Sequence, residues 1–78
     1  MNNKRFATRI RDIRKAKGIT ATFIARKLGY KNVSSYTRLE KGEITITLER
    51  AKQIADLLQV DINEFFYDQN LRDSRKVV

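Results

Sequence analysis

Apolar residues recur at helical spacing along most of the chain, in short segments that end at single glycines. Within residues 4–17, Phe6, Ile10 and Ile13 share one face of a helix, and lysines and arginines fill most other positions. Gly18 follows directly, as is typical of a helix C-terminus. The pattern therefore predicts an amphipathic first helix with a basic outer face.

Two shorter helices are expected next, at about residues 21–28 and about residues 33–40. Thr20 is a suitable N-cap for the first of them, and Gly29 follows its apolar stripe. Asn32 is a suitable N-cap for the second, which has only one apolar pair and is otherwise small and polar. A core helix needs a wider apolar face, so this pattern favours a helix that presents hydrogen-bonding groups to a partner.

The rest of the pattern predicts two further helices and a polar C-terminal tail. Thr47 is expected to cap a fourth helix, and Asp61 a fifth, with Glu64 completing a capping box. The sequence thus predicts an all-α domain of five helices over residues 1–67, followed by a tail over residues 68–78.

Composition narrows the function. The chain has no cysteine and no histidine, and its nine acidic residues are scattered. We therefore expect no metal site, no cofactor, no small-molecule ligand and no enzymatic activity. No apolar run approaches the roughly 20 residues of a membrane span, and the first residues lack a signal-peptide core. These observations predict a cytoplasmic protein without a membrane partner.

The charge is distributed unevenly along the chain. Residues 1–42 hold twelve basic and two acidic residues, a net of +10, whereas residues 43–78 hold five basic and seven acidic residues, a net of −2. An electropositive half is typical of a surface that faces a polyanion. Solubility alone is the other interpretation of this asymmetry.

The second and third expected helices have the organisation of a helix-turn-helix, whose second helix lies in the DNA major groove. Over residues 9–66 the sequence resembles the DNA-binding domain of the phage repressor, Cro and xenobiotic-response-element family, with its lambda-repressor-like fold. The residues that carry the resemblance are Arg14, Lys17-Gly18-Ile19-Thr20, Ile24-Ala25, Leu28-Gly29, Tyr36-Thr37-Arg38-Leu39-Glu40-Lys41-Gly42, Thr47-Leu48-Glu49, Ile54-Ala55, Leu58 and Asp61-Ile62-Asn63-Glu64-Phe65-Phe66.

The resemblance implies five helices, a symmetric operator and a structural ion pair between Arg14 and Glu40, which would tie the first helix to the end of the third. The charge pattern agrees, because Glu40 is one of only two acids in the basic half. Simple solvation of Glu40 is the alternative. We therefore expect Arg14 to act in the fold rather than on DNA.

The sequence departs from the family pattern in two places. Ala21 stands where the family has a glutamine that contacts DNA, so that contact is lost or is supplied by the neighbouring threonines. The interval before Glu40 is one residue longer than usual, with Lys31 or Asn32 as the insertion. The base-facing register is therefore better defined at the end of the third helix than at its start.

Base-reading residues are expected on the third helix. Arg38 suits a bidentate contact with guanine, and Val33 suits a thymine methyl group. The full set of base-reading candidates is Asn32, Val33, Ser34, Ser35, Thr37 and Arg38. For each serine and threonine, solvation of the helix is an equal alternative. The resemblance implies that Tyr36 packs inward, since it stands where the family has an aliphatic core residue, with its hydroxyl within reach of a phosphate at the edge.

Phosphate contacts are expected around this helix. The candidates are Thr20, Thr22, Lys27, Lys31, Lys41 and the backbone amide of Gly42, with Lys4, Arg5 and Arg9 as an N-terminal clamp. Such contacts set affinity and orientation without carrying sequence information. Long charged side chains are usually only solvated, so we expect half of these candidates at most to act.

One helix-turn-helix covers too few base pairs for specificity, so we expect a homodimer on a pseudo-palindromic operator. The dimer-interface candidates are Leu57, Val60, Phe65, Phe66 and Tyr67, whose alternative role is to cover the first helix. The hypothesis is a sequence-specific, double-stranded-DNA-binding transcriptional regulator, bacterial or phage-encoded, that represses and regulates its own gene. The alternatives are a protein-binding adaptor, such as an antitoxin or anti-repressor with secondary DNA binding, and a nonspecific nucleic-acid binder.

Overall fold

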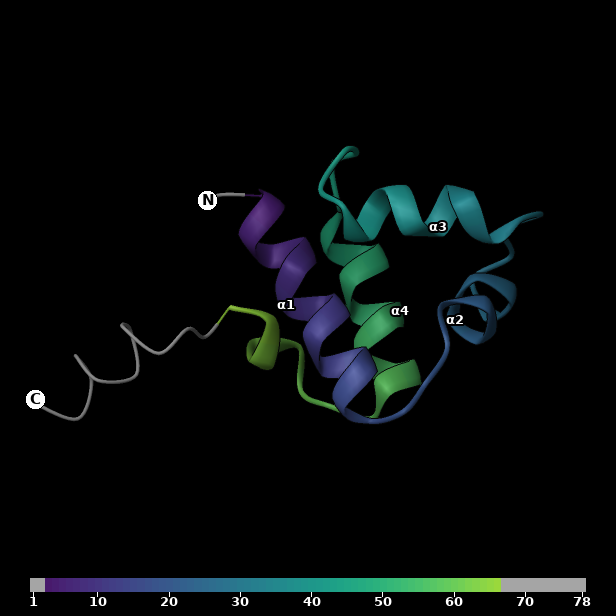
Figure 1. Ribbon diagram of the computed structural model, residues 1–78. Coiled ribbons are helices and arrows are strands. Elements are labelled where there is room, and N and C mark those ends of the chain that lie inside the picture. Colours follow the sequence, from purple (N-terminus) through teal and green to yellow (C-terminus); the bar gives the residue numbers. More distant parts are fainter. Residues whose placement is uncertain (1–2, 67–78) are drawn as a thin grey trace, which may run out of the picture.

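The computed structural model describes residues 3–66, and this stretch contains four α-helices, one 310 helix and no strand. The elements are α1 (Asn3–Ala16), α2 (Ala21–Lys27), α3 (Val33–Glu40), α4 (Leu48–Leu58) and the 310 helix η1 (Ile62–Phe65). In Figure 1, α3 lies along one edge of the molecule, with α2 beside its N-terminal end. The predicted all-helical fold is thus confirmed for the described residues, whereas Tyr67 and the predicted tail lie outside them.

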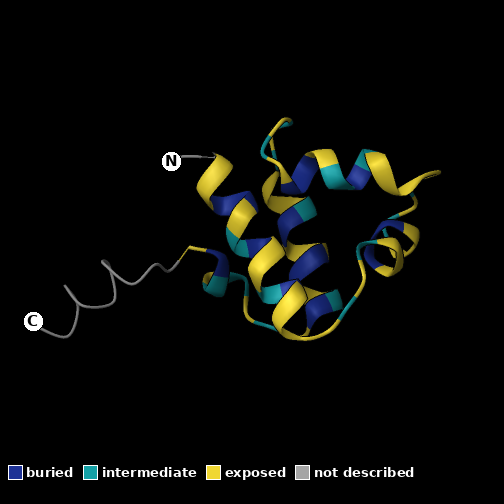
Figure 2. Ribbon diagram, in the orientation of Figure 1, coloured by how far each residue is buried: buried dark blue, intermediate teal, exposed yellow. Residues whose placement is uncertain are grey.

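One apolar core joins all five elements. Ile10 of α1, Ile24 of α2 and Leu39 of α3 are buried in one cluster with Ile54 and Leu58 of α4. Figure 2 shows buried residues on the inward faces of the helices and exposed residues on the outward faces. Burying one such side chain contributes about 1.5–3 kcal/mol relative to leaving it exposed, so this core fixes the inner face of α3.

The helices begin at the capping residues that the sequence predicts. Thr20, Asn32 and Thr47 each accept a hydrogen bond through the side chain from the backbone amide three residues ahead. These bonds satisfy an amide that has no partner within its own helix. The starts of α2, α3 and α4 are therefore determined by local chemistry.

The fifth predicted helix is a single 310 turn, so the prediction of five α-helices is not confirmed. The Asp61 side chain accepts a hydrogen bond from the amide of Asn63, only two residues ahead. The Glu64 carboxylate, predicted to complete a capping box, points to another element: its Oε1 lies 3.9 Å from Nη2 of Arg9 on α1. The Nε of Arg9 also donates to the backbone carbonyl of Glu64, at 2.9 Å.

Aromatic contacts hold this turn against α1. The Phe6 ring packs edge-on against Phe65, with centroids 5.7 Å apart, and is tilted against Phe66, with centroids 4.9 Å apart. Phe65 ends the 310 turn and Phe66 is its C-cap, so both contacts hold the C-terminal end of η1 against α1. Phe65 is only 2% exposed, so its predicted role in a dimer interface is wrong, because its ring belongs to the core of its own chain.

Candidate nucleic-acid interface

The inner face of α3 is anchored by an ion pair between Arg14 and Glu40. Arg14 Nε lies 2.7 Å from Glu40 Oε2, and Arg14 Nη2 lies 3.1 Å from Glu40 Oε1, which makes the contact bidentate. Arg14 Nη1 also donates to the backbone carbonyl of Ile19, at 2.8 Å. The structure thus brings together the two residues that the family resemblance paired.

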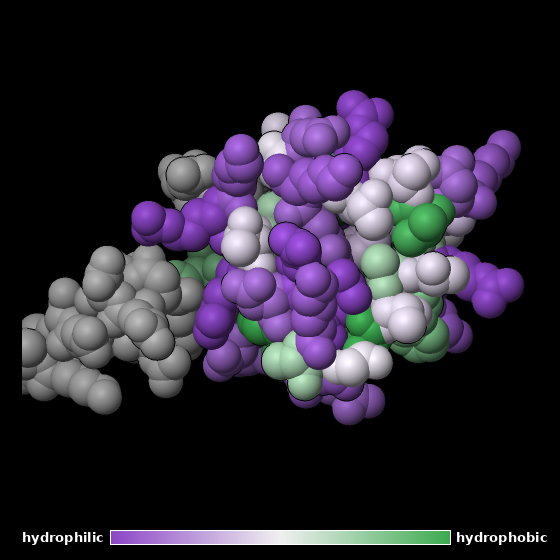
Figure 3. Space-filling view, in the orientation of Figure 1, coloured by the Kyte–Doolittle hydropathy of each residue, from purple (hydrophilic) through white to green (hydrophobic). Residues whose placement is uncertain are grey.

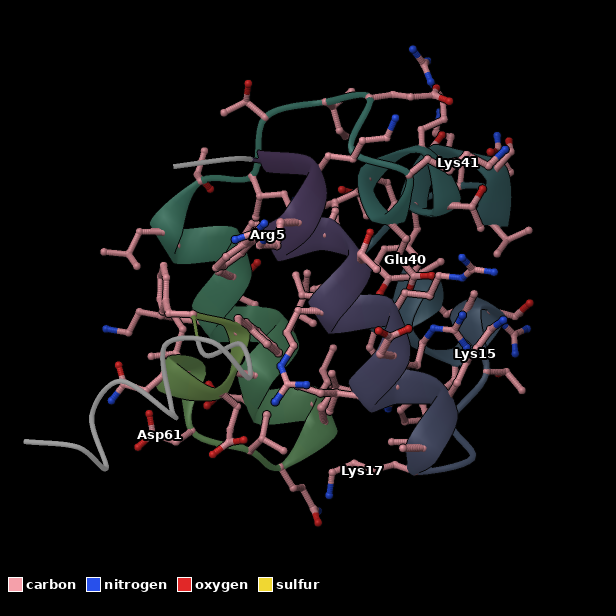
Figure 4. The ribbon with its side chains drawn as sticks, turned by 60° about the vertical axis from the view of Figure 1, so that its left-hand side comes forward. Arg5, Lys15, Lys17, Glu40, Lys41 and Asp61 are labelled. Carbon is pink, nitrogen blue, oxygen red and sulfur yellow. The ribbon has the colours of Figure 1, made fainter. Side chains whose placement is uncertain are left out.

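Both partners of this pair are buried, with side chains 10% and 4% exposed. Figure 4 shows Glu40 between α3 and α1. The hydrogen-bonded Glu40 carboxylate raises the pKa of Arg14 above its ordinary value, against the opposing effect of burial. Arg14 therefore joins α1, the loop before α2 and the end of α3, and its guanidinium is withdrawn from the surface.

Tyr36 packs inward beside this pair. Its side chain is fully buried, and its hydroxyl has no hydrogen-bond partner among the residues that the structure describes. Burial raises the pKa of Tyr36 above its ordinary value, and the nearby Glu40 carboxylate raises it further. A hydroxyl enclosed in this way does not reach the surface, so the prediction of a phosphate contact by Tyr36 is wrong.

The N-terminal end of α3 carries a cluster of local hydrogen bonds. Asn32 Oδ1 accepts from the amide of Ser35 at 3.1 Å and from the hydroxyls of Ser34 and Ser35 at 2.6 and 3.1 Å. One turn later, the Thr37 hydroxyl donates to the carbonyl of Ser34 at 3.0 Å. Four of the six base-reading candidates therefore have their polar groups engaged in capping and stabilising their own helix.

Two of the base-reading candidates project outward. Val33 is 38% exposed at the first position of α3. Arg38 is exposed in the last turn of α3, where its Nε lies 3.3 Å from Oε1 of Glu43. Arg38 has the side chain with the longest reach on this face, and Glu43 is a partner that the sequence analysis did not single out. The signal available in the sequence was an acid placed directly after the glycine that ends the helix.

The turn between α2 and α3 is supported from α4. The Tyr30 ring packs against Tyr36 with centroids 6.2 Å apart, and the Arg50 guanidinium lies 5.2 Å from the Tyr30 ring centroid. Arg50 Nη1 also reaches the carbonyl of Leu28, at 3.4 Å. The longer turn is therefore held by packing. Tyr30 and Arg50 were not predicted for this role, because the contacts of Arg50 with Leu28 and Tyr30 join α4 to a turn about 20 residues earlier.

The predicted phosphate-binding groups outside the N-terminal clamp are of two kinds, exposed side chains and the backbone amide of Gly42. The side chains of Thr20, Thr22, Lys27, Lys31 and Lys41 are exposed. Within this group, the Thr20 hydroxyl caps α2 and the Lys27 ammonium lies 5.7 Å from the Phe23 ring centroid. Figure 3 shows mostly hydrophilic side chains over α1 in this view, and a mixture of hydrophilic and hydrophobic side chains over α2 and α3.

The backbone amide of Gly42 is not available for a phosphate. It donates to the carbonyl of Leu39 at 3.1 Å and so completes the end of α3. Gly42 has a positive φ of 77°, and a Cβ at this position would lie 2.9 Å from the Cα of Lys4. The predicted phosphate contact by Gly42 is therefore wrong, since this glycine instead lets the loop after α3 approach α1 closely.

The remaining candidates for a dimer interface are partly accessible. Leu57 and Val60 are half-buried at the C-terminal end of α4, and Phe66 is 37% exposed. A groove of about 620 Å³ runs past Leu57 to the exposed ring of Phe23 on α2, with Ile19 among its other lining residues. Phe23 is thus an exposed aromatic that the sequence analysis did not assign to any surface.

Two findings bear on other functions. No helix within residues 3–66 is long and apolar enough to cross a membrane. The same residues contain no group of three or more acidic, cysteine or histidine side chains placed to hold a metal ion.

Comparison with known families gives one match. A family model described as helix-turn-helix matches residues 10–65, which include the whole α2–turn–α3 unit and most of the core. No curated protein matches the sequence.

Proposed function

The chain belongs to the helix-turn-helix family of DNA-binding transcription regulators, of the xenobiotic-response-element and lambda-repressor type, and we propose that it is a sequence-specific repressor that binds a pseudo-palindromic operator as a homodimer. One observation carries this proposal. The inner face of α3 is fixed by the core and by Arg14–Glu40, while Arg38 projects from the outer face. A rigidly anchored helix with an exposed arginine is suited to reading the major groove.

Arg38 is the proposed principal base-reading residue. A guanidinium makes two parallel hydrogen bonds to O6 and N7 of guanine, a contact that contributes about 1–3 kcal/mol of discrimination. Val33 is proposed to contact a thymine methyl, because it is apolar and exposed at the helix start. Asn32, Ser34, Ser35 and Thr37 have a secondary role here, since a base contact would compete with the local hydrogen bonds that they make.

The exposed phosphate candidates support affinity and orientation. Thr20 and Thr22 stand at the start of α2, and Lys27, Lys31 and Lys41 carry positive charge on the helix-turn-helix unit and at its end. Of the proposed N-terminal clamp, Arg9 is already bonded to Glu64 of η1, which limits its contribution. Each phosphate that such a group neutralises steepens the dependence of log K on log salt concentration, by about 0.9 in slope.

Dimerisation is proposed through three of the apolar residues that are partly exposed, Leu57, Val60 and Phe66. Two-fold dimers place their recognition helices about 34 Å apart, one turn of DNA. Such a dimer would protect an operator with two inverted half-sites. The repressor is proposed to act at the promoter of its own gene.

Selection of bound duplexes from a random pool, followed by titration of variants, tests this function. The wild-type protein should prefer the selected duplex over random DNA by about 10³-fold or more. Arg38→Ala should relax the preference at one base pair per half-site, whereas Lys41→Ala should weaken binding to all sequences alike. The proposal would be contradicted by a wild-type protein that binds selected and random DNA with equal affinity. It would also be contradicted if Arg38→Ala lowered the affinity for both by the same factor.

A protein-binding adaptor is the second candidate function, and the groove beside Phe23 is the observation that favours it. Phe23 is 43% exposed, although its neighbours on the outer face of α2 are polar. Exposed aromatics are enriched at protein interfaces. Under this alternative the chain would bind neither selected nor random duplexes well, and Phe23→Ser would abolish partner binding while leaving the fold intact.

A further inference from the structure

Glu43 is joined to Arg38 by two contacts at the end of α3. Its backbone amide donates to the carbonyl of Arg38 at 3.0 Å, which continues the hydrogen bonding past the last turn. Its carboxylate Oε1 lies 3.3 Å from Arg38 Nε. The backbone hydrogen bond therefore holds the Glu43 carboxylate beside Nε of Arg38.

This carboxylate is an unexpected charge on a surface that faces a polyanion. Between Asp12 and Glu49 the sequence contains only two acids, Glu40 and Glu43. Glu40 is buried and paired, but the Glu43 side chain is 49% exposed. An exposed carboxylate near DNA phosphates weakens association through like-charge repulsion. Its position next to the proposed base-reading arginine points to a role other than affinity.

We propose that Glu43 is a positioning residue that sets the sequence specificity of Arg38, an inference that rests on the proposed DNA-reading function. Glu43 engages Nε, so the two terminal nitrogens of the guanidinium are the ones directed to a base. Those nitrogens form the planar edge that matches O6 and N7 of guanine. Glu43 thus holds the arginine in the orientation that a guanine requires.

Glu43 also acts against the wrong sequences. Without a guanine at the right place, Arg38 gains only by swinging to a phosphate, and that movement breaks its contact with Glu43. The carboxylate is then left unpaired beside the DNA backbone, which is unfavourable. On cognate DNA, Arg38 contacts both Glu43 and the guanine. On non-cognate DNA, it contacts either Glu43 or a phosphate, but not both.

Titration of four variants against two duplexes tests this inference. The duplexes are the one selected by the wild-type protein and a scrambled duplex of the same length, and the variants are Glu43→Gln, Arg38→Ala, the double variant and Glu49→Gln. Glu49→Gln is the matched control, because it removes the same charge from an exposed glutamate in the first turn of α4. We expect Glu43→Gln to tighten binding to scrambled DNA about tenfold and to selected DNA less. The ratio of the affinity for selected DNA to the affinity for scrambled DNA should therefore fall at least about threefold. Glu49→Gln should leave the ratio unchanged.

The double variant shows whether Glu43 acts through Arg38. In the Arg38→Ala background, Glu43→Gln should change both affinities by the same factor. A ratio that still falls there, or a single Glu43→Gln variant that shifts both duplexes equally, would overturn the inference. If the wild-type protein itself shows no preference, the proposed function fails instead.

A second readout does not depend on DNA. The Arg38 Nε–H resonance of the free protein should be protected from exchange with water, and Glu43→Gln should remove that protection. The urea midpoint of unfolding should remain that of the wild-type protein, since the pair is exposed. An unprotected Nε–H in the wild-type protein would contradict the positioning role.

Discussion

Two arginine–glutamate pairs flank α3, and they share their chemistry but little else. On the inner side, Arg14 and Glu40 meet in a bidentate contact with side chains that are almost fully buried. On the outer side, Arg38 and Glu43 meet through one longer contact, with side chains 62% and 49% exposed. The two pairs lie on opposite sides of the same short helix.

The environment gives these pairs opposite roles. In the interior, removal of one partner leaves a buried charge without compensation, which costs about 3–5 kcal/mol. At the surface, water screens the attraction, and an exposed pair contributes only about 0–1 kcal/mol. The inner pair therefore determines where α3 lies, while the outer pair is weak enough for Arg38 to exchange its partner for a base.

The largest expected effect compares the same substitution in the two pairs. Glu40→Gln should lower the free energy of unfolding by about 3 kcal/mol, because Arg14 stays buried without an opposite charge. Glu43→Gln should change it by no more than about 0.5 kcal/mol. Urea unfolding followed by circular dichroism measures both, and equal losses would remove the distinction between the two pairs.

A smaller effect is expected where the loop after α3 meets α1. Gly42→Ala combines an unfavourable positive φ with a Cβ that would contact the Lys4 backbone, so we expect a loss of about 2–3 kcal/mol. Gly18→Ala is the matched control, because Gly18 has a similar φ of 72° and nothing within 4 Å of the added Cβ. It should lose only about 1 kcal/mol.

The comparison of the two glycines isolates the contact between the loop and α1. Thermal unfolding of both variants under identical conditions gives the difference in stability. If the two variants lose the same stability, the end of α3 is not held by close packing against α1.

The smallest expected effect comes from Tyr36, which lies beside the inner pair. In the unfolded chain Tyr36 ionises near pH 10, but burial raises its pKa in the fold. Above about pH 10 the unfolded state therefore binds fewer protons than the folded state. The free energy of unfolding should then fall with rising pH, by up to about 1.4 kcal/mol per pH unit.

Tyr36→Phe is the control for this pH dependence. The variant should lack the contribution of Tyr36 between about pH 9 and about pH 11, and at neutral pH it should be about 1 kcal/mol more stable, because a buried hydroxyl without a partner is removed. Urea unfolding at neutral pH, at about pH 9 and at about pH 11 measures both effects. An unchanged alkaline slope would show that the Tyr36 hydroxyl reaches solvent.

The helical architecture followed from the sequence because its signals are local. A cap needs only the side chain and an amide two or three residues ahead, as at Thr20, Asn32 and Thr47. Apolar spacing of three and four residues likewise indicates the buried face of each helix. These features gave the range of α3, while the family resemblance implied the inward position of Tyr36.

Two of the errors arose where a side chain found a partner far away in the sequence, whereas the error at Gly42 involved an acceptor only three residues away. Glu64 was expected to cap its own helix, but its carboxylate lies near Arg9, 55 residues earlier. Phe65 was assigned to a dimer interface, but its ring is enclosed against Phe6. The amide of Gly42 was assigned to a phosphate, but it completes the end of α3.

The sequence by itself determined the helices, their caps and a basic N-terminal half, since each depends on neighbouring residues or on composition alone. Only the tertiary structure decided which charged side chains are exposed at the surface and which are buried. The family resemblance implied the Arg14–Glu40 pair, but only the structure shows both side chains buried between α1 and α3, and Arg38 exposed beside Glu43. Burial depends on how elements from the whole chain pack together, and a residue's own position in the sequence does not contain that information.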